Sequence, residues 1–191
     1  MGALSDDKLM RMYREGDADA FDALFDRYHA PVYNFARMML DGAPGADDVL
    51  QETFLAVARA AGDYEPRGRF RAWIMRVARN QCLDCLRAAT RRRLALVETG
   101  LGPAEPVSRE ARPPEWLAAD EHADALYRLI AALPERQREA VVLRAFEGMS
   151  YGEIASTLGV PINTVKTLIH RARASLAAAL GPGQRESQRE L

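Results

Sequence analysis

The sequence of 191 residues has little of what builds catalytic and metal sites. It contains three histidines and two cysteines, and only 7% of its residues are aromatic. The histidines are far apart in the sequence, and no glycine-rich phosphate loop of the P-loop or dinucleotide type occurs. These absences make an enzyme the weakest candidate function, and we expect neither a cofactor nor a bound metal.

Long apolar runs are also missing. No stretch of 18 apolar residues occurs, so we expect no membrane-spanning helix. The first eight residues include two acids and no apolar stretch, so we expect no secretory signal and a cytoplasmic protein. Strand-like alternation is absent while helical periodicity recurs, which predicts an all-α fold.

The two cysteines, Cys82 and Cys85, form a CxxC spacing inside an amphipathic helical pattern. A structural zinc site needs four ligands, and no second CxxC or nearby histidine accompanies this pair. The pattern therefore favours small packed thiols over a zinc site.

A net charge of −1 conceals a strong segregation of charge. Residues 1–66 carry 6 basic and 13 acidic side chains, whereas residues 67–93 carry 9 basic and 1 acidic. Residues 94–126 are acidic again, and residues 127–191 are basic. Blocks of alternating sign suggest several partner surfaces on one chain, and the alternative is a set of solvated helix faces.

Breaks in the helical pattern divide the chain. Residues 8–93 and 117–180 are periodic, residues 94–116 are acidic and rich in proline and glycine, and residues 181–191 are polar. Since proline and glycine interrupt helices, the sequence predicts two small helical domains on a flexible linker, with a disordered tail.

The segment from Asp47 to Ala61 is predicted to be a helix with an acidic face. Its apolar stripe comprises Leu50, Phe54, Val57 and Ala61. Asp47 and Asp48 fall in the first turn, where the helix dipole favours carboxylates, and Gln51 and Glu52 continue this side.

The helix predicted from Phe70 to Arg87 is basic. The residues expected to face inward are Phe70, Trp73, Ile74, Val77 and Ala78. The residues expected on its other faces are Arg69, Arg71, Arg76, Arg79, Asn80 and Arg87, with Arg91–Arg93 following its end. Asp84 is expected to pair with Arg87. Tyr64, on the preceding loop, is a candidate for stacking on a base, with plain loop packing as the alternative.

Residues 150–173 have the spacing of a helix-turn-helix. Ser150 and Glu153 form an S-x-x-E capping box, which predicts a helix from about Tyr151. Gly159 ends this helix, and Pro161 suits the first position of the next. The predicted inner faces comprise Ile154, Ala155 and Leu158, then Val165, Ile169, Ala172 and Leu176.

The outer face of the second helix in this motif carries amide, hydroxyl and cationic groups. Its members are Asn163, Thr164, Lys166, Thr167, His170, Arg171 and Arg173. Cations neutralise phosphates, while Asn and Thr reach base edges in the major groove. We predict DNA binding here, and the alternative is a basic helical hairpin with no DNA role.

Together these motifs resemble the sigma-70 family of bacterial RNA polymerase sigma factors, in its small extracytoplasmic-function group. The first half matches at Asp47–Phe54, Phe70–Ile74 and Ala78–Asn80, with Asp84 and Arg87. The second half matches at Leu133-Pro134, Arg138, Glu147–Tyr151, Glu153–Ala155, Leu158–Pro161, Thr164–Lys166 and Arg171–Arg173.

The resemblance implies a promoter-specificity subunit rather than an enzyme. Asp47, Asp48, Gln51 and Glu52 would bind the clamp helices of the largest subunit of core RNA polymerase. Tyr64, Arg76, Arg79, Asn80 and Arg87 would contact the −10 element, and the helix-turn-helix would bind the −35 element. An anti-sigma factor is a further implied partner. The linker would run toward the polymerase active centre, and a disordered spacer is the alternative.

One departure from the family pattern concerns the second helix of the motif. Ile162 and Asn163 precede Thr164, and Leu168 stands where the family usually has arginine. This change predicts altered −35 recognition, or a protein contact on that face. The competing function is a helix-turn-helix regulator that acts without core polymerase, as a dimer on two half-sites.

Overall fold

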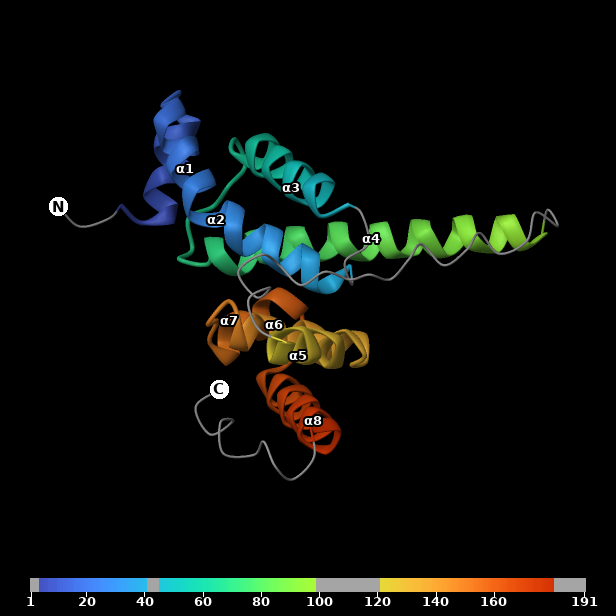
Figure 1. Ribbon diagram of the computed structural model, residues 1–191. Helices are drawn as coiled ribbons and strands as arrows, with labels where there is room; N and C mark the ends of the chain where they lie inside the picture. Colours follow the sequence, from blue (N-terminus) through green and yellow to red (C-terminus); the bar gives the residue numbers. More distant parts are fainter. Residues whose placement is uncertain (1–3, 41–44, 99–120, 181–191) are drawn as a thin grey trace. The chain divides into compact units, whose positions relative to one another are not determined.

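A computed structural model of the chain describes residues 4–40, 45–98 and 121–180. Within these ranges the backbone forms α-helices and loops and no strand (Figure 1), which confirms the all-α prediction. The predicted tail and all of the predicted linker beyond residue 98 lie outside the described residues. None of the described helices is both long and apolar enough to cross a membrane.

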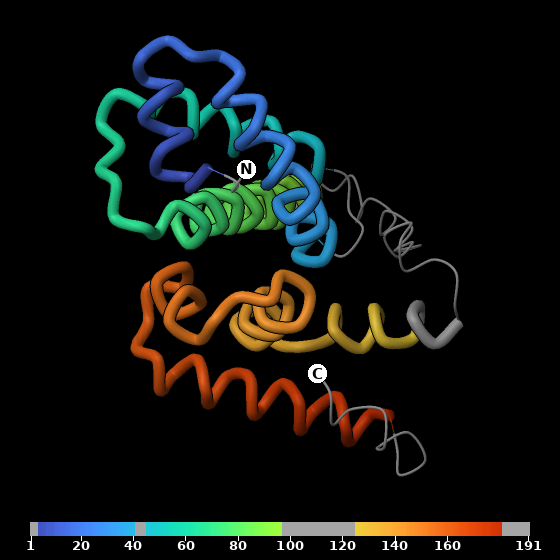
Figure 2. The backbone as a smooth tube through the Cα atoms, turned by 90° about the vertical axis from the view of Figure 1, so that its left-hand side faces the viewer, coloured from blue at the N-terminus to red at the C-terminus, as the bar shows by residue number. Residues whose placement is uncertain are grey.

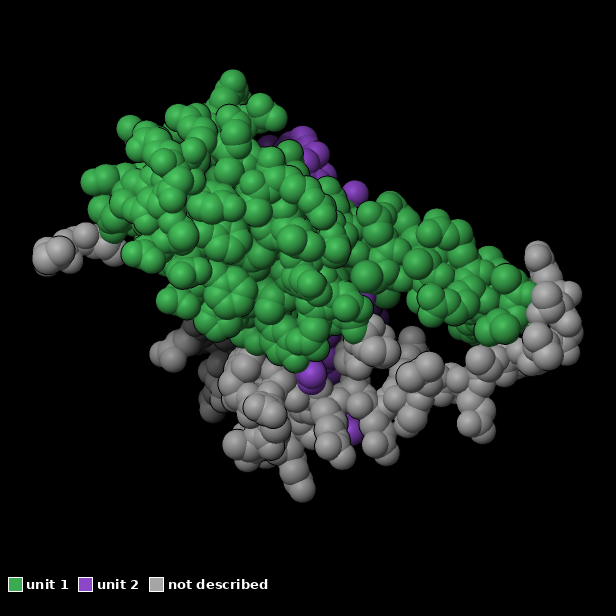
Figure 3. Space-filling view, turned by 90° about the horizontal axis from the view of Figure 1, so that it is seen from above, with its two compact units in different colours: residues 1–36, 43–107 green, residues 37–42, 108–191 purple. Residues whose placement is uncertain are grey.

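The chain divides into two compact units, residues 1–36 with 43–107 and residues 37–42 with 108–191 (Figure 3). The N-terminal half contains α1 (Asp6–Arg14), α2 (Ala18–Met39), α3 (Ala46–Ala60) and α4 (Phe70–Glu98). The C-terminal half contains α5 (Glu121–Ala131), α6 (Glu135–Ala145), α7 (Tyr151–Leu158) and α8 (Ile162–Leu180). The domain limits of 8–93 and 117–180 stay predictions.

The few aromatic residues of the first unit gather where its helices cross. Phe21 and Phe25 of α2 lie 6.0 and 4.8 Å from Phe54 of α3, between ring centroids. Tyr28 of α2 lies 5.3 Å from Phe70 of α4. Because α3 and α1 also pack on α4, these rings join all the helices around one core.

The helix α2 continues through Pro31 without a break. A proline inside a helix costs about 3 kcal/mol, because it removes a hydrogen bond and crowds the preceding turn. Tyr28, Val32 and Phe35 flank it and are buried. Burial of each such side chain contributes about 1.5–3 kcal/mol, which offsets the cost of the proline.

The helix α4 is longer than expected and continues to Glu98, and it is seen from the side in Figure 1 and nearly end-on in Figure 2. The prediction that Arg91–Arg93 follow the end of the helix is therefore wrong, because they lie within it. No glycine or proline occurs between Phe70 and Glu98, and the first breaker is Gly100. The residues after Arg93 are good helix formers, so nothing local ends the helix there.

The buried face of α3 is rotated relative to the predicted stripe. Phe54, Val57 and Ala61 are buried as expected, but Leu50 is only half-buried. Val49 and Thr53 are fully buried instead. The buried side of the helix thus includes Val49 and Thr53, which lie opposite its acidic residues.

The helix-turn-helix forms as predicted. The Ser150 hydroxyl accepts a hydrogen bond from the Glu153 backbone N–H at 3.3 Å, and the Ser150 N–H donates to Glu153 Oε2 at 2.8 Å, which closes the capping box. Gly159 ends α7 in the left-handed region with φ of 65°. Helix α8 begins at Ile162, one residue later than expected, because Pro161 supplies the carbonyl that accepts its first hydrogen bonds.

Most predicted inner-face residues of the helix-turn-helix are buried. Val165, Ile169, Ala172 and Leu176 of α8 and Ile154 and Leu158 of α7 all lie in the core. Ala155 is only half-buried, and Thr157 takes a place in the core that the pattern missed. Local periodicity therefore fixes most of this domain's packing.

Two glycine substitutions on α7 are expected to have opposite effects on stability. Gly159→Ala places a Cβ in the left-handed region, which costs about 1 kcal/mol. Gly152→Ala sits inside the helix, where its Cβ would meet only Ser150 Oγ at 4.0 Å, so it should stabilise by about 0.5–1 kcal/mol. Thermal melting followed by circular dichroism measures both, and melting shifts of the same sign would contradict the prediction.

Candidate nucleic-acid interface

The four acidic and amide residues predicted on α3 share one exposed face. Asp47, Asp48, Gln51 and Glu52 are all exposed and lie within roughly 140° of the helix circumference. The opposite side is buried in the first unit. Arg59 lies 3.8 Å from Glu52, but both side chains are half-exposed or more, so this ion pair is weak. The acidic face is therefore accessible to a partner.

Leu55 lies within this acidic face and is not among the residues predicted for it. It is 38% exposed, one turn after Gln51 and Glu52. The signal for it is this spacing of four and three residues, which places Leu55 on the same side of the helix as Gln51 and Glu52. Protein interfaces commonly combine an apolar centre with a polar rim, and Leu55 supplies such a centre.

Three of the residues predicted to contact the −10 element share one face of α4. Arg76, Asn80 and Arg87 are exposed and lie within roughly 40° of one another around the helix. The predicted pair of Asp84 and Arg87 is confirmed at 3.0 Å, with both side chains about two-thirds exposed. Arg91 continues this face one turn further. We name the residues Arg76, Asn80, Arg87 and Arg91 the basic face of α4.

Arg79 does not lie on this basic face. It is 8% exposed, and the outward placement expected for it is wrong. Arg79 follows Met75 by four residues and precedes Cys82 by three, and both are buried, so it shares their side of the helix. One guanidinium nitrogen lies 3.4 Å from Asn80 Oδ1. Arg79 therefore adjoins the basic face from within the core.

Tyr64 is held by contacts within the protein. Its hydroxyl donates a hydrogen bond to Asp7 Oδ1 at 2.6 Å, and its ring lies 5.8 Å from Phe70 and 5.6 Å from Trp73. Burial and the hydrogen bond to Asp7 raise the pKa of Tyr64, so the phenol is neutral at physiological pH. These contacts favour loop packing, and stacking on a base stays a prediction. Trp73, expected in the core, is only half-buried beside it.

The two cysteines lie on the covered side of α4. Cys82 is buried, Cys85 is half-buried, and neither forms a disulfide. Burial raises the pKa of the Cys85 thiol, and the negative charges of Asp48 and Asp84 add to the effect. A protonated thiol is a poor nucleophile and metal ligand, which agrees with the packed-thiol interpretation.

All seven residues predicted on the outer face of α8 are exposed. Asn163, Thr167 and His170 lie opposite the buried stripe, at helical spacings of four and three. Lys166 with Arg173 and Thr164 with Arg171, each pair seven residues apart, form the two edges. A polar centre between cationic edges matches a DNA groove, where bases lie between two phosphate backbones.

Three further residues shape the properties of this face. The Thr167 hydroxyl donates to the Asn163 carbonyl at 3.0 Å, so it is engaged with its own helix. Leu168 is half-buried, as expected for a residue that widens the apolar stripe. Ile162, the first residue of α8, is 44% exposed and was not predicted as a contact residue. An apolar side chain there suits a thymine methyl group in the major groove.

An apolar hollow of about 410 Å³ lies between α5, α6 and α8. Ile130, Val141 and Leu176 are among its lining residues. Arg144 and Arg173 also line it, so two cationic groups accompany the apolar walls, together with the imidazole of His170. This hollow adjoins one edge of the outer face of α8, since it shares His170 and Arg173 with that face.

Comparison with known protein families matches both halves of the chain. Residues 24–92 match the family model for sigma-70 region 2, and residues 123–176 match the model for sigma-70 region 4. The first match contains the acidic face of α3 and the basic face of α4. The second contains the helix-turn-helix. The chain belongs to the sigma-70 family, in its extracytoplasmic-function group.

Curated relatives of this sigma factor cover nearly its whole length. The extracytoplasmic-function sigma factor SigM of Mycobacterium tuberculosis is 37% identical over 177 residues, covering 93% of this chain and 85% of SigM. The RNA polymerase sigma-H factor of Pseudomonas aeruginosa is 32% identical over 187 residues, covering 95% and 97% of the two chains. The solved structure of CnrH, in complex with the cytosolic domain of CnrY, matches with a TM-score of 0.69 and 31% identity, covering 93% of this chain and 97% of CnrH.

Membership of this family identifies the general function. The protein is a promoter-specificity subunit that binds core RNA polymerase and directs transcription initiation through the −10 and −35 elements. Sigma factors are non-catalytic subunits of the polymerase. The function predicted from the sequence is confirmed, in preference to a helix-turn-helix regulator that acts without core polymerase.

Proposed function

We propose that the exposed acidic face of α3 is the surface by which this sigma factor docks on core polymerase. The accessibility of Asp47, Asp48, Gln51 and Glu52 is the observation that carries the proposal. Carboxylates on a rigid helix raise the rate of association with a basic partner and fix how the two surfaces align. Leu55 adds an apolar contact among these carboxylates. The partner is the basic surface of the clamp helices in the largest polymerase subunit.

The basic face of α4 then holds the melted −10 strand. Arg76, Arg87 and Arg91 neutralise phosphates, and Asn80 hydrogen-bonds to an exposed base. Arg79 is too buried to reach the strand and supports Asn80 from behind. Tyr64 and the half-buried Trp73 lie at the N-terminal end of this helix, where an aromatic surface suits an unpaired base. Binding the single-stranded form preferentially converts binding energy into strand opening.

The outer face of α8 binds the −35 element as duplex DNA. Asn163, Thr167 and His170 face base edges, while Lys166, Arg171 and Arg173 contact phosphates on either side. Two modest DNA sites on one chain then act with a high effective concentration once the polymerase holds that chain.

Loss of one phosphate contact is expected to weaken binding to all −35 sequences by a similar factor. Lys166→Ala should lower transcription from promoters that need the −35 element by roughly fivefold to tenfold, and reduce the salt dependence of binding by about one ion. Lys8→Ala, at the chain's other lysine, is exposed and lies on α1, so it is the matched control. An equal loss in both variants would contradict the assignment.

A cytosolic inhibitory partner is part of the same proposal. CnrH was solved with the cytosolic domain of CnrY bound, and the family resemblance implies an anti-sigma factor. The apolar hollow between α5, α6 and α8, with Arg144 and Arg173 in its lining, suits an amphipathic segment bearing acidic side chains. The sigma factor acts in the cytoplasm, where polymerase and chromosome are, and it works by binding alone.

Run-off transcription tests the proposed function. Core polymerase with the full-length protein is supplied with a genomic library, and the transcripts define its promoters. Start sites that depend on the added protein and share −10 and −35 motifs are expected. Tight binding of promoter duplex by the isolated chain at physiological salt would contradict the proposal, because each cationic face is small and the acidic segments repel phosphate.

A further inference from the structure

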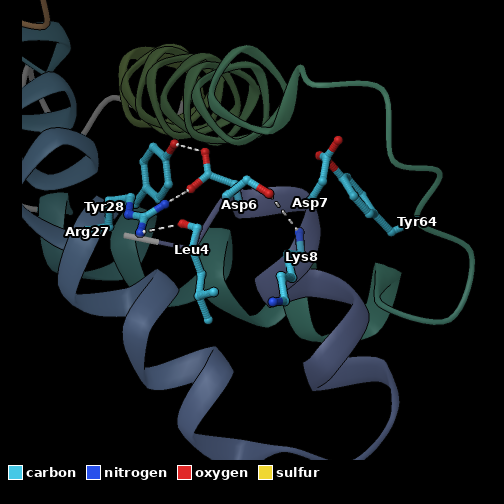
Figure 4. Close-up of polar contacts among 8 residues, drawn as sticks. Leu4, Asp6, Asp7, Lys8, Arg27, Tyr28 and Tyr64 are labelled. Atoms are coloured by element: carbon cyan, nitrogen blue, oxygen red, sulfur yellow. Dashed lines mark hydrogen bonds and ion pairs between the residues drawn. The ribbon is translucent and has the colours of Figure 1, made fainter. Parts of the chain in front are cut away.

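The carboxylate of Asp7 joins α1 to the loop between α3 and α4. Asp7 Oδ1 accepts a hydrogen bond from the Tyr64 hydroxyl at 2.6 Å, and Figure 4 shows these two side chains next to each other. Asp7 Oδ2 accepts a second hydrogen bond, from the Gly68 backbone N–H, at 2.7 Å. Both oxygens are therefore used, on two points of the loop four residues apart. Hydrogen bonds to a charged acceptor are short and strong, so this carboxylate fixes the shape of the loop.

The rest of the loop offers weaker constraints. Residues 65–69 are all exposed, and the ion pair of Arg67 with Glu65 joins two exposed side chains of the loop itself. Such a pair contributes little to stability. Gly68 has a φ of 64°, a left-handed conformation that glycine adopts without strain, so its own backbone preference does not fix the loop. The two hydrogen bonds that Asp7 accepts hold Gly68 and Tyr64 in place, with Tyr64 against Phe70 and Trp73.

Asp7 is itself held firmly in place. The neighbouring Asp6 accepts a hydrogen bond from the Tyr28 hydroxyl at 2.6 Å and pairs with Arg27, which joins the start of α1 to α2. Ser5 caps α1 by accepting from the Lys8 N–H at 3.4 Å. Two adjacent acids thus divide their roles, since Asp6 anchors α1 and Asp7 anchors the loop.

We propose that Asp7 is a positioning residue for promoter opening. It holds Tyr64 and Gly68 so that the aromatic surface of Tyr64 and Trp73 meets the N-terminal end of the basic face of α4 in one fixed arrangement. Because the loop is already ordered in the free protein, binding of the melted strand does not have to include the entropy cost of ordering the loop. This inference rests on the proposed role of α4 in binding the −10 strand.

The test uses holoenzyme assembled from core polymerase and the full chain, on a promoter found by run-off transcription. Asp7→Asn removes the charged acceptor. Its amide oxygen can still accept from the Gly68 N–H and its amide nitrogen can donate to the Tyr64 hydroxyl, so the two charge-assisted bonds become weaker neutral ones. The rate of open-complex formation, measured by permanganate reactivity of the −10 thymines, should fall about tenfold. The affinity for core polymerase, measured by fluorescence anisotropy, should stay within about twofold, because the acidic face of α3 is unchanged.

Three matched variants separate positioning from other effects. Ser5→Ala weakens α1 without touching the loop, and Asp63→Asn removes an exposed charge from the loop without touching Asp7. Both should open the promoter at nearly the wild-type rate. Tyr64→Phe keeps the ring but loses its bond to Asp7, so it should slow opening. Combined with Asp7→Asn it should add less than its own effect, as coupled residues do.

Several results would overturn the inference. These are wild-type opening by both Asp7→Asn and Tyr64→Phe, fully additive effects in the double variant, or an equal loss in Ser5→Ala. Failure of the proposed function looks different. In that case the wild-type holoenzyme opens no promoter, or substitution of the basic face of α4 leaves opening unchanged.

Discussion

Reversal of two charges on α3, Asp48→Lys with Glu52→Lys, should abolish run-off transcription and raise the Kd for core polymerase by about 100-fold or more. Both side chains are exposed, so the fold loses little. Each lysine places a cation where the proposed partner is also basic, which converts attraction into repulsion. Fluorescence anisotropy with labelled protein measures the Kd, and thermal melting reports on stability.

The matched control for this charge reversal lies on α2. Asp22→Lys with Asp26→Lys makes the same charge change at the same spacing of four residues, on exposed positions outside the acidic face. It should bind core polymerase with nearly wild-type affinity. Asp48 lies in the first turn of α3, where a lysine costs about 0.5–1 kcal/mol against the helix dipole. Glu52→Lys alone lies beyond that turn, so strong core binding by this variant would contradict the docking surface even if the double variant were unstable.

The second large effect is expected on α4. The combined variant Arg76→Ala, Asn80→Ala and Arg87→Ala should reduce open-complex formation by about 100-fold while leaving core binding intact. All three side chains are exposed. The substitutions remove the weak ion pair of Arg87 with Asp84 and the 3.4 Å hydrogen bond that Asn80 accepts from Arg79. Each substitution should therefore cost no more than about 1 kcal/mol of stability.

Two arginines on other faces of the same helix provide the control. Arg92→Ala with Arg93→Ala also removes two positive charges, but from exposed positions that lie away from the basic face. If strand opening needs only net charge, both sets of substitutions slow it equally. A selective loss in the first set supports a defined contact along Arg76, Asn80 and Arg87.

The second half of the chain was predictable because its rules are local. The capping box of Ser150 and Glu153, the left-handed Gly159 and the stripe from Val165 to Leu176 each depend on residues within a few turns. Helical periodicity then determines which side is exposed, so the outer face of α8 followed directly. The acidic face of α3 followed in the same way, apart from Leu55.

The predictions were wrong where contacts between elements far apart in the sequence determine which residues are buried. Arg79 is charged and was expected outside, but it falls on the side of α4 that carries Met75 and Cys82. Whether that side is covered depends on helices far away in the sequence. The bond of Tyr64 to Asp7 spans 57 residues and has no local signature. Helix α4 continues past the predicted end at about Arg87 because neither Arg91–Arg93 nor the residues up to Glu98 break a helix.

The packing of α3 on α4 has a mechanical consequence. Phe54 and Val57 of α3 and Ile74 and Ala78 of α4 are all buried, and the two helices pack directly on each other. Helix α4 spans about 43 Å as one rod. A partner that binds α3 therefore also sets the orientation of α4. A small tilt at the binding surface becomes a displacement of several ångströms at the C-terminal end of α4.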